Sequence, residues 1–156
     1  MRVLVECYHD VALVRSLGVP IRRVGHELSK GNVLRTLARS SGRAIGIVDA
    51  DPGKPHSNPS EMAKYQEDVD ERGLRLMKHR DDPHKSLVII HPRLEEWLLA
   101  RAEACGIQPA EYGLPPTARD MHRSARCDRK PGFGRFLADL AASDDGLRTL
   151  SAWLGV

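Results

Sequence analysis

Three acidic side chains stand at the points where two apolar segments of the chain end. Residues 2–6 (RVLVE) close on Glu6, and the apolar residues 44–48 (AIGIV) are followed at once by Asp49 and Asp51. Carboxylate oxygens in such a group are the ligands that Mg²⁺, or Mn²⁺ in its place, prefers in proteins. A bound divalent ion neutralises the charge of a phosphate group and orients an attacking oxygen. The acids therefore predict a divalent-metal site suited to phosphodiester chemistry.

A structural role is the alternative interpretation of Asp49 and Asp51. Short acids after a strand often cap the next segment or accept hydrogen bonds from the amides of a turn, and Pro52 and Gly53 predict a loop directly after the pair. Glu6 favours metal binding, because an acid that follows the buried residues RVLV has no comparable structural explanation.

The elements that must position these acids alternate along the chain. The predicted strands are residues 2–6, 20–24, 44–48, 74–77 and 87–90, and the predicted helices are residues 10–17, 32–38, 60–72, 94–105, 133–142 and 147–154. This alternation is typical of an α/β protein with a three-layer, mostly parallel sheet. Ligands bind beyond the carboxyl ends of the strands in such sheets, so Glu6 and Asp49 are expected on the same rim.

Length and composition favour one folded domain. The chain has 156 residues, of which 41% are hydrophobic and 29% are charged, and its formal net charge is +3. This balance excludes wholesale disorder and is too weak by itself to indicate nucleic-acid binding. We expect an α/β core over residues 1–106. Residues 107–156 are expected to form a basic loop and a short helical C-terminal extension packed on that core.

Cysteine usage and hydropathy predict the location of the protein. The three cysteines are far apart, and their odd number excludes a fully paired disulfide framework, which fits a reducing compartment. The apolar run at residues 3–5 is too short for a signal peptide, and no segment approaches the roughly 18 apolar residues of a membrane span. We therefore expect a cytoplasmic protein without membrane contact, and its oligomeric state stays open.

Two motifs together resemble those of a known family. Residues 6–10 (ECYHD) follow a predicted strand, and residues 49–51 (DAD) close a later one. This pattern resembles that of TOPRIM domains, which occur in topoisomerases, bacterial primases and the overcoming-lysogenization-defect (OLD) nucleases. Residues 91–98 (HPRLEEWL) are also similar to a helix start in small stand-alone TOPRIM-like proteins near the OLD group. The resemblance covers about residues 1–106 and implies a TOPRIM/Rossmann-like fold.

The resemblance also implies a role for each acid. Glu6 is the expected acid/base or metal-binding glutamate, Asp49 and Asp51 are the expected metal ligands, and Asp10 is a supporting acid. Glu6 and Asp49 are thus the expected catalytic residues. Cys7 departs from the family pattern, in which a glycine lets the backbone approach phosphate closely.

Glu95 and four basic residues are further candidates. Glu95 opens the helix predicted at residues 94–105, where it is either a ligand of a second metal ion or only a partner of the helix dipole. The basic residues that we expect to contact the phosphates of a nucleic acid are Lys30, Lys54, Arg123 and Arg126. The alternative for each of them is a solvated surface charge.

Two functions from different classes remain open at this point. The first is a Mg²⁺- or Mn²⁺-dependent nuclease that hydrolyses phosphodiesters of DNA or RNA. The second is a non-catalytic TOPRIM-like module that binds metal or nucleic acid, or docks on a partner protein such as an ATPase. A dinucleotide-binding Rossmann domain is disfavoured, because no GxGxxG follows the first predicted strand.

Overall fold

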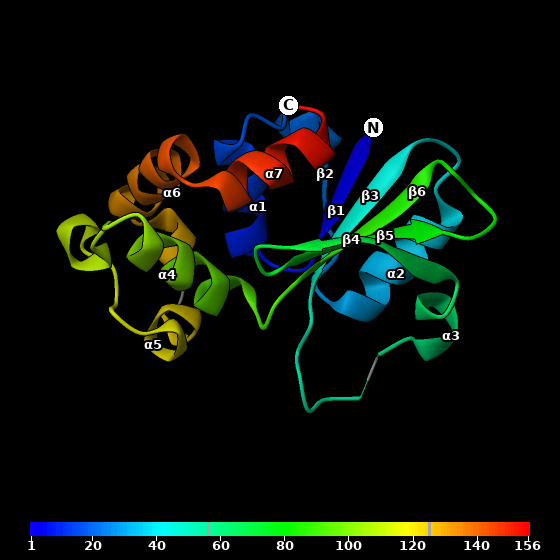
Figure 1. Cartoon of the computed structure of the whole chain (residues 1–156), viewed down its shortest axis with the longest axis horizontal. Helices are drawn as coiled ribbons and strands as arrows, with labels where there is room; N and C mark the ends of the chain where they lie inside the picture. Colours follow the sequence, from blue (N-terminus) through cyan, green and yellow to red (C-terminus); the bar gives the residue numbers. More distant parts are fainter. Residues whose placement is uncertain (56, 125) are drawn as a thin grey trace.

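A six-stranded mixed sheet forms the centre of the protein in a computed structural model, which describes residues 1–55, 57–124 and 126–156 (Figure 1). The strands are β1 (Arg2–Val5), β2 (Val24–His26), β3 (Ala44–Asp49), β4 (Tyr65–Glu71), β5 (Leu74–His79) and β6 (Lys85–Ile90). Their order across the sheet is β2-β1-β3-β6-β5-β4. The first four strands in this order are parallel, and β5 runs antiparallel to both of its neighbours. The predicted α/β class and the mostly parallel sheet are confirmed.

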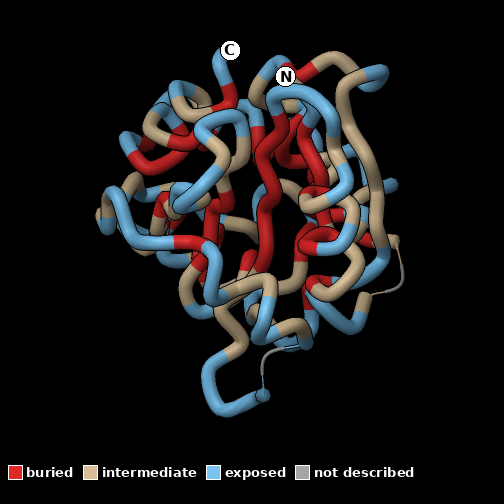
Figure 2. The backbone as a smooth tube through the Cα atoms, turned by 90° about the vertical axis from the view of Figure 1, so that its right-hand side faces the viewer, coloured by how far each residue is buried: buried red, intermediate tan, exposed pale blue. Residues whose placement is uncertain are grey.

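Helices cover both faces of the sheet because the strand side chains alternate between two apolar clusters. The helices are α1 (Tyr8–Ser16), α2 (Lys30–Arg39), α3 (Pro59–Met62), α4 (Leu94–Ala104), α5 (Ala118–Arg123), α6 (Pro131–Ser143) and α7 (Asp145–Leu154). Helix α2 packs on one face, whereas α1, α4, α6 and α7 pack on the other (Figure 1). The buried residues, red in Figure 2, lie mainly in the strands and on the inner sides of the helices that cover them.

Gly46 lets α2 approach the sheet closely. A Cβ atom at this position would lie 2.9 Å from both Leu87 Cδ1 and Val33 Cγ1, a separation that packed side chains do not reach. The neighbouring residues Ile45 and Ile47 point to the opposite face and pack in the other cluster. The glycine in AIGIV therefore brings α2 against the middle of β3.

The prediction of a helix at residues 60–72 is wrong. Its first residues form the one-turn helix α3, and the rest form the edge strand β4, which pairs with β5 in a hairpin. Arg72 and Gly73, both with positive φ, make the tight turn of that hairpin. The charges of β4 led to the helical assignment, but charged side chains are also how an exposed edge strand resists pairing with other chains.

Two further differences concern the segments that flank the core. Residues 21–23 form a 3-10 turn (Ile21–Arg23), and the predicted strand at 20–24 is displaced to β2. Beyond α4, 3-10 turns Pro109–Tyr112 and Cys127–Arg129 flank α5. Side chains of α6 and α7 belong to the same apolar cluster as those of β1 and β3. None of the helices in the described ranges combines the length and apolar character needed to cross a membrane.

Candidate functional site

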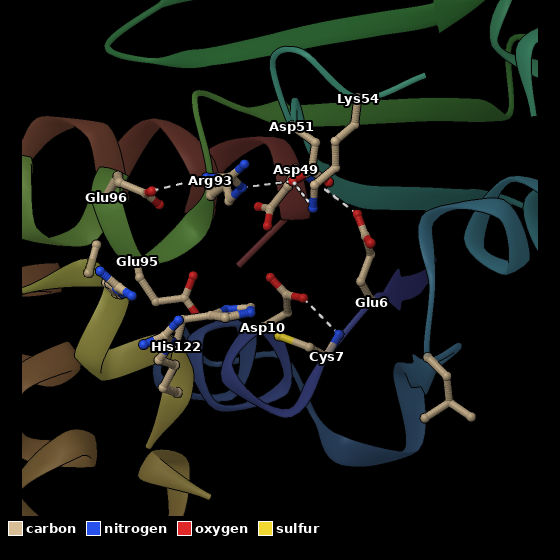
Figure 3. A pocket seen from close by; sticks show the side chains of 14 residues that line it. Glu6, Cys7, Asp10, Asp49, Asp51, Lys54, Arg93, Glu95, Glu96 and His122 are labelled. Carbon is tan, nitrogen blue, oxygen red and sulfur yellow. Dashed lines mark hydrogen bonds and ion pairs between the residues drawn. The ribbon is translucent and has the colours of Figure 1, made fainter. Parts of the chain in front are cut away.

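The predicted acids line one pocket at the carboxyl ends of β1 and β3. Glu6 directly follows β1, Asp49 ends β3, and Asp51 lies in the turn that follows. Asp10 comes from the first turn of α1 and Glu95 from the first turn of α4. Figure 3 shows these carboxylates around a pocket of about 430 Å³, which Glu96 also lines. All five acids that the sequence offers as candidates therefore lie at one pocket.

Glu6 and Asp49 are connected through the backbone of the neighbouring strand. Because β1 and β3 are adjacent and parallel, with Val5 opposite Ile47, the Glu6 carboxylate reaches the end of β3. Its Oε1 accepts a hydrogen bond from the backbone N–H of Asp49 at 2.9 Å. Asp49 Oδ1 in turn accepts one from the N–H of Leu94 at 2.9 Å. The first turn of α4 is thereby tied to the end of β3.

Asp10 is a buried acid that holds the start of α1. Its carboxylate accepts a hydrogen bond from the backbone N–H of Cys7 at 2.8 Å, and the residue is only 4% exposed. This is one half of a capping box, in which an acid in the first turn satisfies a backbone donor that the helix leaves free. Asp10 thus has a structural role in addition to lining the pocket.

Burial without enough positive charge raises the pKa values of three of these acids. The pKa of Glu6 is raised to about 7, first by burial and then by the charges of Asp10 and Asp51. The pKa of Asp49 is raised to about 8 by burial and by the negative charges of Asp10, Glu6 and Glu95. The pKa of Asp10 is raised to about 6, again mainly by burial. Near neutral pH these groups take up and release protons, which is typical of functional sites.

Asp51 has the opposite electrostatic character. Arg93 Nε donates a hydrogen bond to its Oδ1 at 2.8 Å, Lys54 Nζ lies 3.5 Å from Oδ1, and Lys30 Nζ lies 3.6 Å from Oδ2. Burial raises the pKa of Asp51, but the hydrogen bond from Arg93 and the lysine charges outweigh burial and leave it below the ordinary value. Asp51 is therefore an ionised and already neutralised carboxylate.

Glu95 is held by two histidines. Its Oε1 lies 2.8 Å from Nδ1 of His9 and 3.3 Å from Nδ1 of His122, and the residue is 3% exposed. Burial raises the pKa of Glu95, but hydrogen bonding, led by that from His9, lowers it below the ordinary value overall. The carboxylate oxygen that faces the histidines is thus occupied, which leaves Glu95 less suited to a metal ion than Glu6 or Asp49.

The donor set suits a hard cation that keeps most of its waters. Glu6 and Asp49 each use one carboxylate oxygen in a backbone hydrogen bond, and the second oxygen of each makes none with the residues that the structure describes. Across residues 1–55, 57–124 and 126–156, no group of three or more His, Cys, Asp or Glu side chains is arranged to hold a metal ion by itself. Mg²⁺ is commonly bound by one or two carboxylates, with water and substrate phosphate completing its coordination. Two free carboxylate oxygens fit that mode.

The four predicted basic residues are divided between this pocket and its surroundings. Lys54 and Arg123 line the pocket. Lys30 is buried, and it stabilises the loop after β3 because its Nζ donates a hydrogen bond to Ala50 O at 3.3 Å. Arg126 lies outside, with its guanidinium 3.7 Å from the ring centroid of Tyr8 and paired with Asp128.

Several lining residues were not predicted from the sequence, among them Arg93, Arg119 and His122, and also Glu96. Arg93 stands in the quoted stretch HPRLEEWL, and its position directly before a helix at a strand end was an available signal. Arg119 and His122 lie in the basic segment that also contains Arg123, but no local pattern indicated that this segment folds back over the start of α4. All three cysteines are free thiols, and burial raises the pKa of the Cys7 thiol strongly.

Comparison of the chain with models of protein families, with curated proteins and with solved structures gave no match. The contacts and charges of its own side chains are therefore the basis on which a function is assigned.

Proposed function

We propose that this protein is a divalent-metal-dependent phosphodiester hydrolase with a TOPRIM-like active site, which acts on DNA or RNA. One observation carries the proposal. Glu6 and Asp49, at the ends of adjacent parallel strands, are joined by a hydrogen bond, each keeps an oxygen without a hydrogen bond to the described residues, and both have raised pKa values. A cation between two such carboxylates relieves the repulsion that burial and neighbouring charges create.

The roles of the side chains follow from their electrostatics. Glu6 and Asp49 would hold Mg²⁺ or Mn²⁺, with Asp51 and Asp10 close by. Such an ion, when bound, neutralises the non-bridging oxygens of a phosphodiester. Where Asp49 alone holds the ion, Glu6, whose pKa is about 7 in the metal-free protein, is instead able to accept a proton from an attacking water near neutral pH. Asp51, ionised and held by Arg93, fixes the loop after β3 so that Asp49 stays in place.

The test is cleavage of labelled DNA and RNA, each single- and double-stranded, with Mg²⁺, with Mn²⁺ and with EDTA. We expect metal-dependent cleavage that falls about 100-fold or more in Glu6→Gln and in Asp49→Asn. Glu96→Gln is the matched control, because Glu96 lines the same pocket but pairs only with Arg93 among the described residues. Wild-type rates in both Glu6→Gln and Asp49→Asn would refute the assignment.

A non-catalytic binding module is the second candidate, and the geometry of Cys7 favours it. The N–H of Cys7, next to Glu6, is donated to Asp10, so it is not directed at a phosphate in the pocket. A module of this kind would bind metal, nucleic acid or a partner such as an ATPase without hydrolysis. Binding of Mn²⁺ in calorimetry and of nucleic acid in a shift assay, with no cleavage of any substrate above, would establish this alternative.

A further inference from the structure

The wall of the pocket formed by α5 carries positive charge. Arg119 and Arg123 lie four residues apart, which places them on the same side of the helix one turn from each other, and both line the pocket. His122 lies between them in sequence and lines it too. Figure 3 shows His122 beside Glu95, on the side of the pocket away from Glu6. The pocket thus combines the carboxylates described above, here called the acidic floor, with the positively charged side formed by α5, here called the basic wall.

The arginines of α5 differ from the other cations of the pocket because their charges are not neutralised. Arg93 is paired with Asp51 and with Glu96, and Lys54 is paired with Asp51. Arg119 and Arg123 are exposed and make no ion pair or side-chain hydrogen bond with any residue in the described part of the chain. Two neighbouring positive charges without an acidic partner are available to an anion.

Helix α5 is nevertheless held firmly at the edge of the pocket. Met121, on its inner side, is fully buried in the main apolar cluster. Thr117 caps the helix by accepting a hydrogen bond from the N–H of Asp120 at 3.1 Å, and its hydroxyl binds the Asp120 carboxylate at 2.7 Å. Glu95 holds His122 at 3.3 Å. These contacts fix the orientation of α5. They also satisfy the carboxylate of Asp120, which is the acid within the helix. Arg119 and Arg123 therefore extend from a helix that is held in place.

We infer that Arg119 and Arg123 bind the phosphodiester backbone of a nucleic-acid strand whose reacting phosphate lies at Glu6 and Asp49. This inference rests on the proposed function and deepens it. Two guanidinium groups beyond the acidic floor contact phosphates next to the reacting one, because arginine binds phosphate oxygens through paired donors. The substrate is therefore a polynucleotide strand rather than a small phosphate ester with a single phosphate. The backbone is contacted irrespective of base sequence.

The test measures binding without metal and without cleavage. Labelled single-stranded DNA and RNA of one mixed sequence are titrated with protein in EDTA, by fluorescence anisotropy, at several salt concentrations. Loss of two phosphate contacts to a single strand reduces the slope of log K against log salt concentration by about 1.4. We expect that reduction, with an affinity about tenfold or more weaker at low salt, in the double variant Arg119→Ala/Arg123→Ala. Arg119→Lys/Arg123→Lys should keep most of the slope.

A matched control is available on α2. Arg35 and Arg39 are also exposed and four residues apart, but they do not line the pocket. Arg35→Ala/Arg39→Ala removes the same charge and should leave the slope as in the wild type. Equal slopes for the wild type and the Arg119→Ala/Arg123→Ala variant, or equal losses in both double variants, would overturn the inference.

Binding and cleavage separate the inference from the proposed function on which it rests. If the wild type cleaves and the Arg119→Ala/Arg123→Ala variant, here called the α5 variant, binds and cleaves as well as the wild type, the two arginines do not contact the strand. The hydrolase assignment then stands. If the α5 variant loses binding while the wild type never cleaves under any metal, the strand contact stands and the hydrolase assignment is wrong. Unchanged thermal unfolding of the exposed α5 variant shows that a loss of binding is not a loss of fold.

Discussion

Replacing Asp49 with asparagine tests the electrostatics of the pocket directly. The asparagine Oδ1 can still accept the hydrogen bond from the N–H of Leu94, and the change in size is small, so the substitution removes mainly the charge. The pKa of Asp49 is raised from an ordinary 3.8 to about 8 by burial and by the neighbouring acids. Asp49→Asn should therefore be more stable than the wild type in alkaline solution, although it is the variant expected to lose activity.

The size and pH window of the effect follow from linkage. Between pH 4 and pH 8 the folded protein keeps a proton on Asp49 that the unfolded chain has lost, so the free energy of unfolding of the wild type falls as the pH rises. Each pKa unit is worth about 1.4 kcal/mol, so the rise from 3.8 to about 8 makes about 6 kcal/mol the upper limit for the cost of ionising Asp49 in the folded protein. Relaxation and entry of water reduce this cost. We expect the free energy of unfolding of Asp49→Asn to exceed that of the wild type by about 3 kcal/mol at pH 9 and to be almost equal to it at pH 4.

Urea unfolding in EDTA at pH 4, 6, 8 and 9, followed by circular dichroism, measures this difference. Excess Mn²⁺ at pH 8 should stabilise the wild type by about 2.7 kcal/mol once it reaches about 100 times the dissociation constant, and should stabilise Asp49→Asn much less. Glu96→Gln, at a paired and less buried acid, should show no comparable gain at high pH. A difference between Asp49→Asn and the wild type that is constant from pH 4 to pH 9 would refute the reasoning.

Three further predictions concern backbone conformation, close packing and a buried hydrogen bond, and each is measured by urea unfolding. Leu28→Gly should stabilise the protein by about 1 kcal/mol, because Leu28 has a φ of 70° and is 73% exposed; destabilisation would contradict this. Gly132→Ala should lower the free energy of unfolding by about 3 kcal/mol, because the added Cβ would lie 1.7 Å from the carbonyl oxygen of Tyr112. Gly134→Ala is the control and should not destabilise the protein, because its Cβ would enter open space. Lys30→Met should cost about 1–3 kcal/mol by leaving Ala50 O without its buried donor, and an unchanged midpoint would show that this contact is dispensable.

The position of the acidic floor was predictable from the sequence for a geometrical reason. Adjacent parallel strands end at the same edge of a sheet, so acids that close apolar strands at Glu6 and Asp49 meet once β1 and β3 are neighbours. The predicted helix at residues 94–105 was confirmed as α4, because its apolar spacing and its acidic first turn are local signals. The strand at residues 44–48 was confirmed for a similar reason.

The features that were not predictable depend on contacts between distant segments. The charges of β4 have no helical or strand period strong enough to decide between the two, and only pairing with β5 makes the segment a strand. The contact between Glu95 and His122 joins α4 to α5 across 27 residues, and no pattern within either helix specifies it. The basic wall of the pocket exists only because α5 folds back in this way.

The charges of the pocket separate acids that maintain the structure from acids left for a ligand. Asp51 and Glu95 are each matched by basic side chains or histidines, and their pKa values are lowered. Glu6 and Asp49 have raised pKa values because burial and neighbouring acids outweigh the positive charge near them. A fold selected for stability alone gains nothing from that repulsion, since an amide would keep both backbone hydrogen bonds without the charge. A bound cation would remove that repulsion, so the acids that destabilise the metal-free protein are those that would favour a metal ion most.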